Sequence, residues 1–400
     1  MTAPGLKSGG PKTSEGLKVA TRGEIPPFIV MDVMREANER SAAGEGILHL
    51  EVGQPGTPAP AKVIEAARRA LAENRLGYTD ALGLPALRQR IAEHYKIAYG
   101  LEVPVERIAV TVGASGGILL GLLAAFDPGD RVALAAPSYP CYRNMLAAIG
   151  NEPVVLNAEL EQRFQPTPEL LDKVEGPLHG LFIASPSNPA GTMVDRAALA
   201  RLIDYCAARG IRVLSDEIYH GITYGEPAVS ALALTDEAIV INSFSKYFSM
   251  TGWRLGWMVL PPDLVRAVER LSQNLFISPP TLSQLAGLAA FDCRAECDAL
   301  VAAYARNRAL LLERLPRAGF DRLAPADGAF YIYADVGRLT NDSDEFCRRM
   351  LAEARVAATP GIDFDSDRGR RFVRFSFAGA EAEIAEAAER LEHWLSRGDL

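Results

Sequence analysis

The sequence of 400 residues contains few cysteines and few histidines. Five cysteines are an odd number and too few for a disulfide framework in a chain of this length, so we expect a reducing, cytoplasmic environment. Cys293 and Cys297 stand four residues apart in a predicted helix, where two thiols on a helix face are a simpler interpretation than half of a metal site. The five histidines show no HExxH or similar spacing, and we therefore predict no metal.

Long apolar runs and an excess of positive charge are also missing. No apolar run reaches the roughly 18 residues of a membrane span, so no membrane partner is expected. Residues 1–22 (MTAPGLKSGGPKTSEGLKVATR) lack the apolar core of a secretory signal. The net charge of −8 argues against nucleic acid as a partner. A small-molecule ligand fits this composition better.

The length and the 48% of hydrophobic residues favour two domains of an α/β protein. We predict a flexible tail over residues 1–22 and a segment over residues 23–52 that joins the smaller domain. Residues 53–290 alternate short apolar runs with helical patterns, as a parallel sheet with crossover helices does. Residues 291–400 begin with a long helical pattern and predict a smaller α+β domain. The strands predicted in the larger domain are Ile108–Val112, Arg131–Ala136, Pro153–Leu156, Gly180–Ala184, Ile211–Ser215, Ala238–Ser243 and Trp257–Leu260.

Small or polar residues follow these strands, and open α/β sheets bind ligands at the carboxyl ends of their strands. The turn Gly113-Ala114-Ser115-Gly116-Gly117 leads directly into the apolar helix ILLGLLAAF, and the N–H groups at this junction could bind a phosphate. An ordinary strand-to-helix turn explains that pattern equally well. The candidate site residues at strand ends are Ser115, Tyr139, Asn188, Asp216 and Lys246.

Lys246 lies in the stretch SFSKYFSMTGWRLG, directly after a predicted strand. Ser243 and Ser245 precede it, and Arg254 follows eight positions later. A lysine among hydroxyls and near a fixed cation can hold an aldehyde as a Schiff base beside a phosphate, as in pyridoxal phosphate enzymes. Taken alone, the pattern also fits a solvated lysine in a polar turn.

The polar residues at the other strand ends suit a pyridine ring. Asp216 can keep the ring nitrogen protonated, which makes the ring an electron sink, although a helix N-cap is an alternative role for this residue. Tyr219 and Asn188 can bond the ring hydroxylate, and Tyr139 can stack on the ring. Lys246, once freed, is the natural base to carry a proton. The phosphate would be held by Ser243, Arg254 and the N–H groups around Ala114 and Ser115.

Four motifs in this order resemble the class I and II pyridoxal phosphate-dependent aminotransferases of fold type I, the aspartate aminotransferase-like family. The motifs are SFSKYFSMTGWRLG, SPSNPAGT, DEIY and VRFSFA, and the resemblance runs from about Pro26 to the C-terminus. It implies a large domain with a mostly parallel seven-stranded sheet flanked by helices, and a smaller α+β domain. It also implies a ping-pong transfer of an amino group between an amino acid and a 2-oxo acid, through a Schiff base on Lys246.

The resemblance assigns roles residue by residue. Arg374 is implied to bind the substrate α-carboxylate, with Gly53 and Asn188 beside it. Tyr78 is implied to reach the phosphate of the neighbouring subunit, which makes the expected assembly a homodimer. The implied catalytic residues are Lys246, Asp216 and Tyr219. The implied cofactor-binding residues are Tyr78, Gly113, Ala114, Ser115, Tyr139, Asn188, Asp216, Tyr219, Ser243, Ser245, Lys246 and Arg254.

One departure from the family pattern concerns the substrate. Members selective for aspartate and glutamate carry an additional cation for the distal carboxylate, and the positions that look equivalent here are Ser115 and Gln273. We therefore expect an amino acid with a neutral or aromatic side chain. Two alternatives share the cofactor site: a fold type I lyase or an acyl-transferring synthase. A regulator that only binds the cofactor is disfavoured, because no basic helix-turn-helix segment precedes Pro26.

Overall fold

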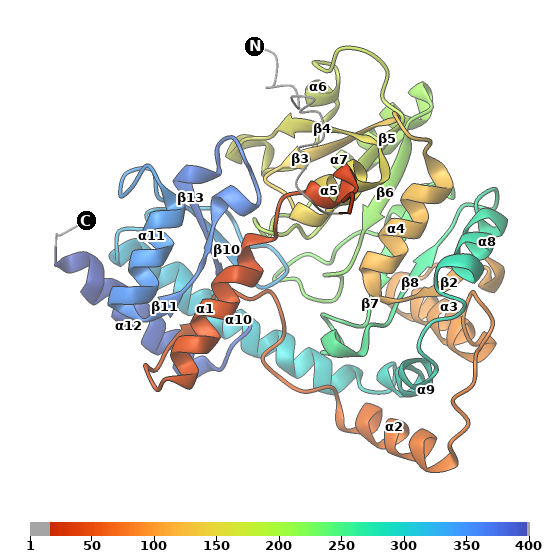
Figure 1. Cartoon of the computed structure of the whole chain (residues 1–400), viewed down its shortest axis with the longest axis horizontal. Coiled ribbons are helices and arrows are strands. Elements are labelled where there is room, and N and C mark those ends of the chain that lie inside the picture. Colours follow the sequence, from red (N-terminus) through yellow and green to blue (C-terminus); the bar gives the residue numbers. More distant parts are fainter. Residues whose placement is uncertain (1–16, 398–400) are drawn as a thin grey trace.

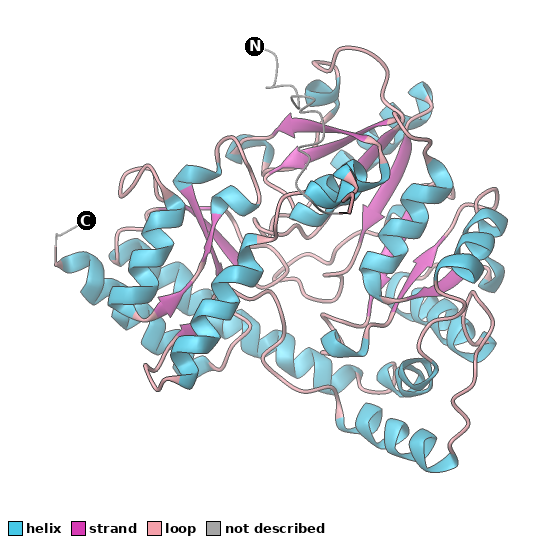
Figure 2. Ribbon diagram, in the orientation of Figure 1, coloured by secondary structure: helices cyan, strands magenta, loops and turns pink. Residues whose placement is uncertain are grey.

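The computed structural model describes residues 17–397, so most of the predicted tail over residues 1–22 lies outside the described residues. Two sheets, each with its own helices, lie side by side (Figure 1). The long helix α10 (Arg294–Arg317) extends from one part of the molecule to the other. Figure 2 shows that helices flank the strands of both sheets. Among the described residues, no helix has the length and apolar character to cross a membrane.

The larger sheet has seven strands in the order β2-β8-β7-β6-β5-β3-β4. All neighbouring pairs are parallel except those that β8 makes with β2 and β7. The predicted mostly parallel, seven-stranded sheet is therefore confirmed. Its strands are β2 (Ile108–Thr111), β3 (Arg131–Ala136), β4 (Glu152–Asn157), β5 (Gly180–Ala184), β6 (Arg212–Asp216), β7 (Ile239–Ser243) and β8 (Gly256–Val259).

Both faces of this sheet are covered, which explains why its central strands are continuous apolar runs. Successive side chains point to opposite faces, so Leu181 and Phe182 of β5 belong to two different clusters of buried residues. Helices α4 (Gly113–Ala125), α5 (Pro140–Ile149) and α8 (Val265–Leu275) cover one face. The other face is covered by α2 (Ala61–Glu73), α3 (Pro85–Tyr99), α7 (Arg196–Arg209) and α9 (Thr281–Ala290).

The smaller sheet is antiparallel, with the order β12-β13-β10-β9. Strand β1 (Leu48–His49) pairs in parallel with β11 (Val356–Ala357), so the chain before residue 53 joins the C-terminal part of the molecule. The boundaries of the two predicted domains remain predictions.

The remaining α-helices and strands are α1 (Ile29–Ala42), α6 (Pro168–Leu171), β9 (Arg322–Leu323), β10 (Tyr331–Asp335), α11 (Ser343–Arg349) with a π-helical turn over Met350–Ala354, β12 (Thr359–Pro360), β13 (Phe372–Ser376) and α12 (Glu381–Ser396).

This arrangement predicts which positions of the large sheet carry its stability. Leu181→Ala removes a fully buried side chain from the central strand β5 and should lower the free energy of unfolding by about 2–5 kcal/mol. Val155→Ala is the matched control, because Val155 lies on the edge strand β4 and is 49% exposed; it should cost less than about 1 kcal/mol. Urea denaturation measures both, and equal losses would contradict the burial pattern.

Candidate active site

The carboxyl ends of the parallel strands open into a cavity of about 240 Å³ between the two sheets. Gly53, from the chain before α2, and Arg374, from β13, line it together with Lys246, which follows β7. The cavity also contains most of the other predicted site residues, namely Ala114, Ser115, Tyr139, Asn188, Asp216, Tyr219, Ser245 and Arg254. Side chains distant in the sequence therefore meet at one edge of the sheet, as expected for an open α/β fold.

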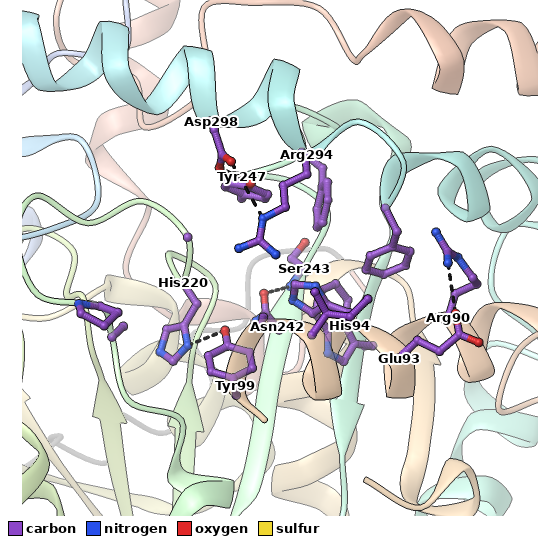
Figure 3. Close-up of a pocket in the computed structure, with 18 of the residues that line it drawn as sticks. Arg90, Glu93, His94, Tyr99, His220, Asn242, Ser243, Tyr247, Arg294 and Asp298 are labelled. Atoms are coloured by element: carbon purple, nitrogen blue, oxygen red, sulfur yellow. Dashed lines mark hydrogen bonds and ion pairs between the residues drawn. The ribbon is translucent and has the colours of Figure 1, made fainter. Parts of the chain in front are cut away.

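A second cavity of about 230 Å³, the rear cavity, lies behind the segment from Ser243 to Lys246 (Figure 3). The two cavities share a wall, because Ser245 and Lys246 line the first cavity whereas Ser243 lines the second. His94 and His220 also line the rear cavity. Burial lowers the pKa of both histidines to about 4, so both are neutral at pH 7.

The charges of the two cavities decide which one suits an anionic cofactor. In the rear cavity Arg90 pairs with Glu93 at 3.0 Å, and Arg294 lies 3.9 Å from Asp298 (Figure 3). Each arginine that lines this cavity thus has a carboxylate beside it. The described residues that line the first cavity instead include three cationic side chains and a single carboxylate, so this cavity holds the greater excess of positive charge.

Among residues 17–397, Lys246 is the only lysine in the lining of the first cavity. Its Nζ donates a hydrogen bond of 2.6 Å to the carbonyl oxygen of Gly53. Burial, followed by the nearby charges of Arg374 and Arg254, lowers the pKa of Lys246 to about 8. About a tenth of this amine is therefore uncharged at pH 7. Only the uncharged form can attack an aldehyde or accept a proton.

Asp216 ends β6 as a fully buried carboxylate on the cavity wall. Its Oδ2 accepts a 2.6 Å hydrogen bond from the hydroxyl of Tyr142, and its Oδ1 accepts the N–H of Ile218 at 3.0 Å. Burial raises the pKa of Asp216 to about 6, against the lowering effect of these two bonds. A buried acid of this kind is stabilised in its charged form by a cationic partner, and a protonated pyridine nitrogen supplies one.

The N-terminus of α4 and Arg254 form the end of the site that suits a phosphate. Gly113 has a left-handed backbone (φ +67°), and a Cβ there would lie 2.5 Å from Nη2 of Arg254. Glycine thus lets the guanidinium approach the first turn of the helix. Ala114 and Ser115 then present their backbone at a helix N-terminus, where an anion is favoured.

Arg374 is buried at the opposite end of the cavity. Its Nη1 donates to Oδ1 of Asn188 at 2.8 Å, and its Nη2 donates to the carbonyl oxygen of Glu51 and, at 3.2 Å, to Thr359. Its Nε is buried without a partner among the described residues. A guanidinium fixed in this way, with donor capacity left over, suits a carboxylate.

The cavity wall nearest to α1 is mostly apolar. Phe28, Val30 and Met31 at the start of α1 line it, together with Ile118 of α4. Asp363 sets the position of α1 through hydrogen bonds to its first turn. An apolar wall in the cavity that also contains Arg374 favours a substrate whose side chain has no charge.

Asp363 holds the first turn of α1 from outside that helix. Its buried carboxylate accepts the N–H groups of Ile29 at 3.1 Å and Val30 at 3.2 Å. These N–H groups would otherwise lack partners at the helix N-terminus. Arg143 of α5 donates to the carbonyl oxygen of Asp363 at 2.6 Å, so the contact joins three parts of the chain.

Three predicted residues do not line this cavity. Gly113 lies behind Arg254. The hydroxyl oxygen of Ser243 lies 2.9 Å from that of Ser245 and 3.0 Å from the carbonyl oxygen of Leu255. Tyr78 is 82% exposed, which leaves its side chain available to another chain. Gln273, weighed as a distal-carboxylate position, is an exposed residue of α8.

Sequence reasoning missed Tyr142 and Tyr331. Tyr142 follows Tyr139 by one helical turn, a spacing that could have shown that both face the same site. Tyr331 lies on β10 of the smaller sheet, and no local pattern marks it. Its hydroxyl lies 2.7 Å from that of Tyr219.

The residues present fit pyridoxal phosphate. The cavity combines a buried amine of lowered pKa, a buried acid and a phosphate-binding helix end, and its positive charge matches an anionic cofactor and a carboxylate substrate. Within the described range 17–397, no group of three or more His, Cys, Asp or Glu side chains is arranged to hold a metal ion.

Comparison with known proteins agrees with this geometry. Residues 45–391 match the family model described as aminotransferase class I and II. The chain is 50% identical over 382 residues to a valine–pyruvate aminotransferase of Mycobacterium tuberculosis, covering 94% of this chain and 98% of the relative. A crystal structure of an aminotransferase from Mycobacterium tuberculosis superposes with a TM-score of 0.94 at 49% identity, covering 96% of this chain and all of the other.

A more distant structure also aligns along nearly the whole chain. The aspartate aminotransferase of Thermus thermophilus with maleate gives a TM-score of 0.88 at 32% identity, covering 94% of this chain and all of the other. The matches include relatives whose names indicate substrates of different charge, so the fold does not by itself specify the side chain of the substrate. The chain therefore belongs to the class I and II aminotransferase family and is a pyridoxal phosphate-dependent aminotransferase that exchanges an amino group between amino acids and 2-oxo acids.

Proposed function

We propose that this enzyme acts on amino acids with neutral side chains and that Lys246 is its catalytic base. The observation that carries the proposal is the cavity, in which Lys246, of lowered pKa, faces a fixed Arg374 and an apolar wall. Pyridoxal phosphate, when bound, supplies an electron sink for the electrons released from the substrate Cα–H bond.

Each side chain then has a task of its own. Arg374 and Asn188 bind the substrate α-carboxylate, which points the Cα–H bond towards Lys246. Nζ of Lys246 accepts the Cα proton and later returns a proton on the product side. Asp216 would keep the ring nitrogen of the bound cofactor protonated, and the hydroxyl of Tyr142 holds that carboxylate in place.

The phosphate is assigned to the end of the site formed by α4. Arg254 and the N–H groups of Ala114 and Ser115 bind it, with the hydroxyl of Ser245 beside them. Tyr139 covers one face of the ring. The ring of Phe28 meets Tyr139 edge-on, with ring centroids 5.6 Å apart.

The neutral preference rests on the lining of the side-chain pocket. The cationic side chains in the lining of the first cavity are Lys246, Arg254 and Arg374, and each already has a role there. Ser115, a position considered for a distal-carboxylate cation, lies in the cavity as a hydroxyl. The relative that is 50% identical bears the name valine–pyruvate aminotransferase, which supports an aliphatic substrate.

We also propose a homodimer in the cytoplasm. The exposed Tyr78 supports a shared site, because its hydroxyl would reach the phosphate of a second copy. The five cysteines carry no disulfide, which supports a reducing compartment. Residues 53–290 are proposed as the cofactor-binding domain, and residues 291–400 with residues 23–52 as the smaller domain, in keeping with the pairing of β1 with β11.

The role of Lys246 is tested by Lys246→Ala. Loss of the base should lower kcat by at least about 10³-fold, while the phosphate contacts retain some cofactor. Steady-state kinetics and the absorbance of the bound cofactor measure both effects. Lys173→Ala, at an exposed position, is the control and should keep full activity. Full activity of the Lys246 variant would overturn the scheme.

The substrate preference is tested with a panel of amino donors. Valine, leucine, alanine and phenylalanine should show larger kcat/KM values than aspartate and glutamate, because a distal carboxylate would be desolvated against the apolar wall of α1. The decisive contrary result is a preference for aspartate and glutamate of more than about a hundredfold, which corresponds to roughly 2.7 kcal/mol.

The dimer is tested with Tyr78→Phe. Sedimentation velocity should show a species of twice the 43.1 kDa chain mass for both proteins. The dissociation constant of pyridoxal phosphate should rise about 10- to 100-fold in the variant, because a hydrogen bond to a charged group is lost. Tyr205→Phe on α7, where the hydroxyl bonds Asp172, is the control. A monomer that binds the cofactor with unchanged affinity would refute the shared site.

A further inference from the structure

Tyr331 is a buried tyrosine of the smaller sheet whose hydroxyl reaches into the cofactor cavity. Its oxygen lies 2.7 Å from the hydroxyl oxygen of Tyr219, and both side chains are buried. A Cβ at residue 53 would collide with this hydroxyl, so glycine is required there by Tyr331 itself. The hydroxyl therefore occupies a fixed position between Tyr219 and the substrate-facing loop at Gly53.

The two hydroxyls share one hydrogen bond, and its direction determines what Tyr219 can do. If Tyr219 donates to Tyr331, its only proton is used and its oxygen can merely accept a bond from another group. If Tyr331 donates, the proton of Tyr219 is free to point towards the ring oxygen of the cofactor. The structure contains a reason for the second direction.

That reason is the charge of Arg374. Its guanidinium carbon lies 4.4 Å from the centre of the Tyr331 ring, closer than to any other ring recorded for this side chain among the described residues. A cation beside a phenol stabilises the phenolate and makes the hydroxyl the better donor. Burial raises the pKa of Tyr331, and the charge of Arg374 is the largest effect that opposes it. For Tyr219, burial and then Tyr331 raise the pKa, and Arg374 opposes them to a smaller extent.

We propose that Tyr331 is a positioning residue that donates its proton to Tyr219 and thereby directs the proton of Tyr219 to the cofactor. The inference rests on the proposed roles of Lys246 and Tyr219. A hydroxyl that accepts one hydrogen bond becomes a stronger donor in the next. The chain Arg374–Tyr331–Tyr219 thus links the group that binds the substrate carboxylate to the group that sets the basicity of the Lys246 nitrogen in the cofactor-bound enzyme.

The sign of the effect follows from the hydrogen bond to the ring oxygen. A donor at that oxygen withdraws electron density and lowers the basicity of the Lys246 nitrogen bound to the cofactor. Loss of the Tyr219 hydroxyl should therefore raise the pKa of that nitrogen. Loss of the Tyr331 hydroxyl should raise it by a smaller amount, because Tyr219 still donates but more weakly.

The experiment measures this pKa in the holoenzyme from the pH dependence of the cofactor absorbance. We expect a rise of about one unit or more in Tyr219→Phe, the equivalent of one hydrogen bond, and of about 0.3–0.6 unit in Tyr331→Phe. The double variant Tyr219→Phe/Tyr331→Phe should match Tyr219→Phe alone, since Tyr331 acts only through Tyr219. The phenylalanine ring preserves the contact with Arg374.

Tyr333→Phe is the matched control. Tyr333 lies two residues along on the same strand, is equally buried, and its hydroxyl has no partner among the described residues, so the pKa should not change. Urea denaturation of each variant checks that the fold is retained.

Several outcomes would overturn the proposal. An unchanged pKa in Tyr331→Phe would do so, as would a shift in the double variant equal to the sum of the single shifts. A rise in Tyr333→Phe as large as that in Tyr331→Phe would point to a general packing effect and would equally refute it. Failure of the proposed function has a separate signature, because the cofactor absorbance would then titrate in the same way in the Lys246→Ala variant.

Discussion

The structure depends on an excess of positive charge enclosed between two sheets. Lys246, Arg254 and Arg374 point into one cavity whose lining contains a single carboxylate, Asp216. Burial lowers the pKa of Lys246, and the nearby like charges of Arg374 and Arg254 lower it further. The arrangement becomes favourable when an anionic cofactor and a carboxylate substrate enter. Burial and the repulsion between these like charges together supply the uncharged amine that the chemistry needs.

The α/β fold is what brings these cations together. The parallel strands end at one edge, so Asp216 after β6 and Lys246 after β7 lie close together through the register of neighbouring strands. Arg374 comes from β13 of the other sheet, where its partners Asn188 and Thr359 hold the guanidinium. Arg374 is therefore fixed by backbone far in sequence from Lys246 and Arg254, which lie eight positions apart in one stretch.

Much of this could be predicted from the sequence, because the large sheet is built of buried strands whose apolar runs are visible and whose ends carry polar residues. Strand β3 was predicted to the residue, and Lys246 and Asp216 were found as strand-end groups. The side chains that support them were harder to find. Tyr142 contacts Asp216, 74 positions later in the sequence, and Tyr331 contacts Tyr219, 112 positions earlier. No periodic pattern in the sequence reveals such contacts. The position of Ser243 behind the first cavity could not be predicted either, since a hydroxyl three positions before Lys246 can turn to either side of the loop.

The contact of Asp363 with the first turn of α1 has a consequence for how the substrate pocket could change over evolution. Asp363 follows β12, and β12 pairs with β13, which carries Arg374. The apolar wall that meets the substrate side chain and the guanidinium that binds its carboxylate are thus fastened to the same small sheet. The distance between the apolar wall and the guanidinium is therefore set by the smaller sheet. Substitutions at Phe28 or Met31 can alter the shape of the pocket without changing that distance. The range of substrates can therefore diverge among relatives while the chemistry stays the same.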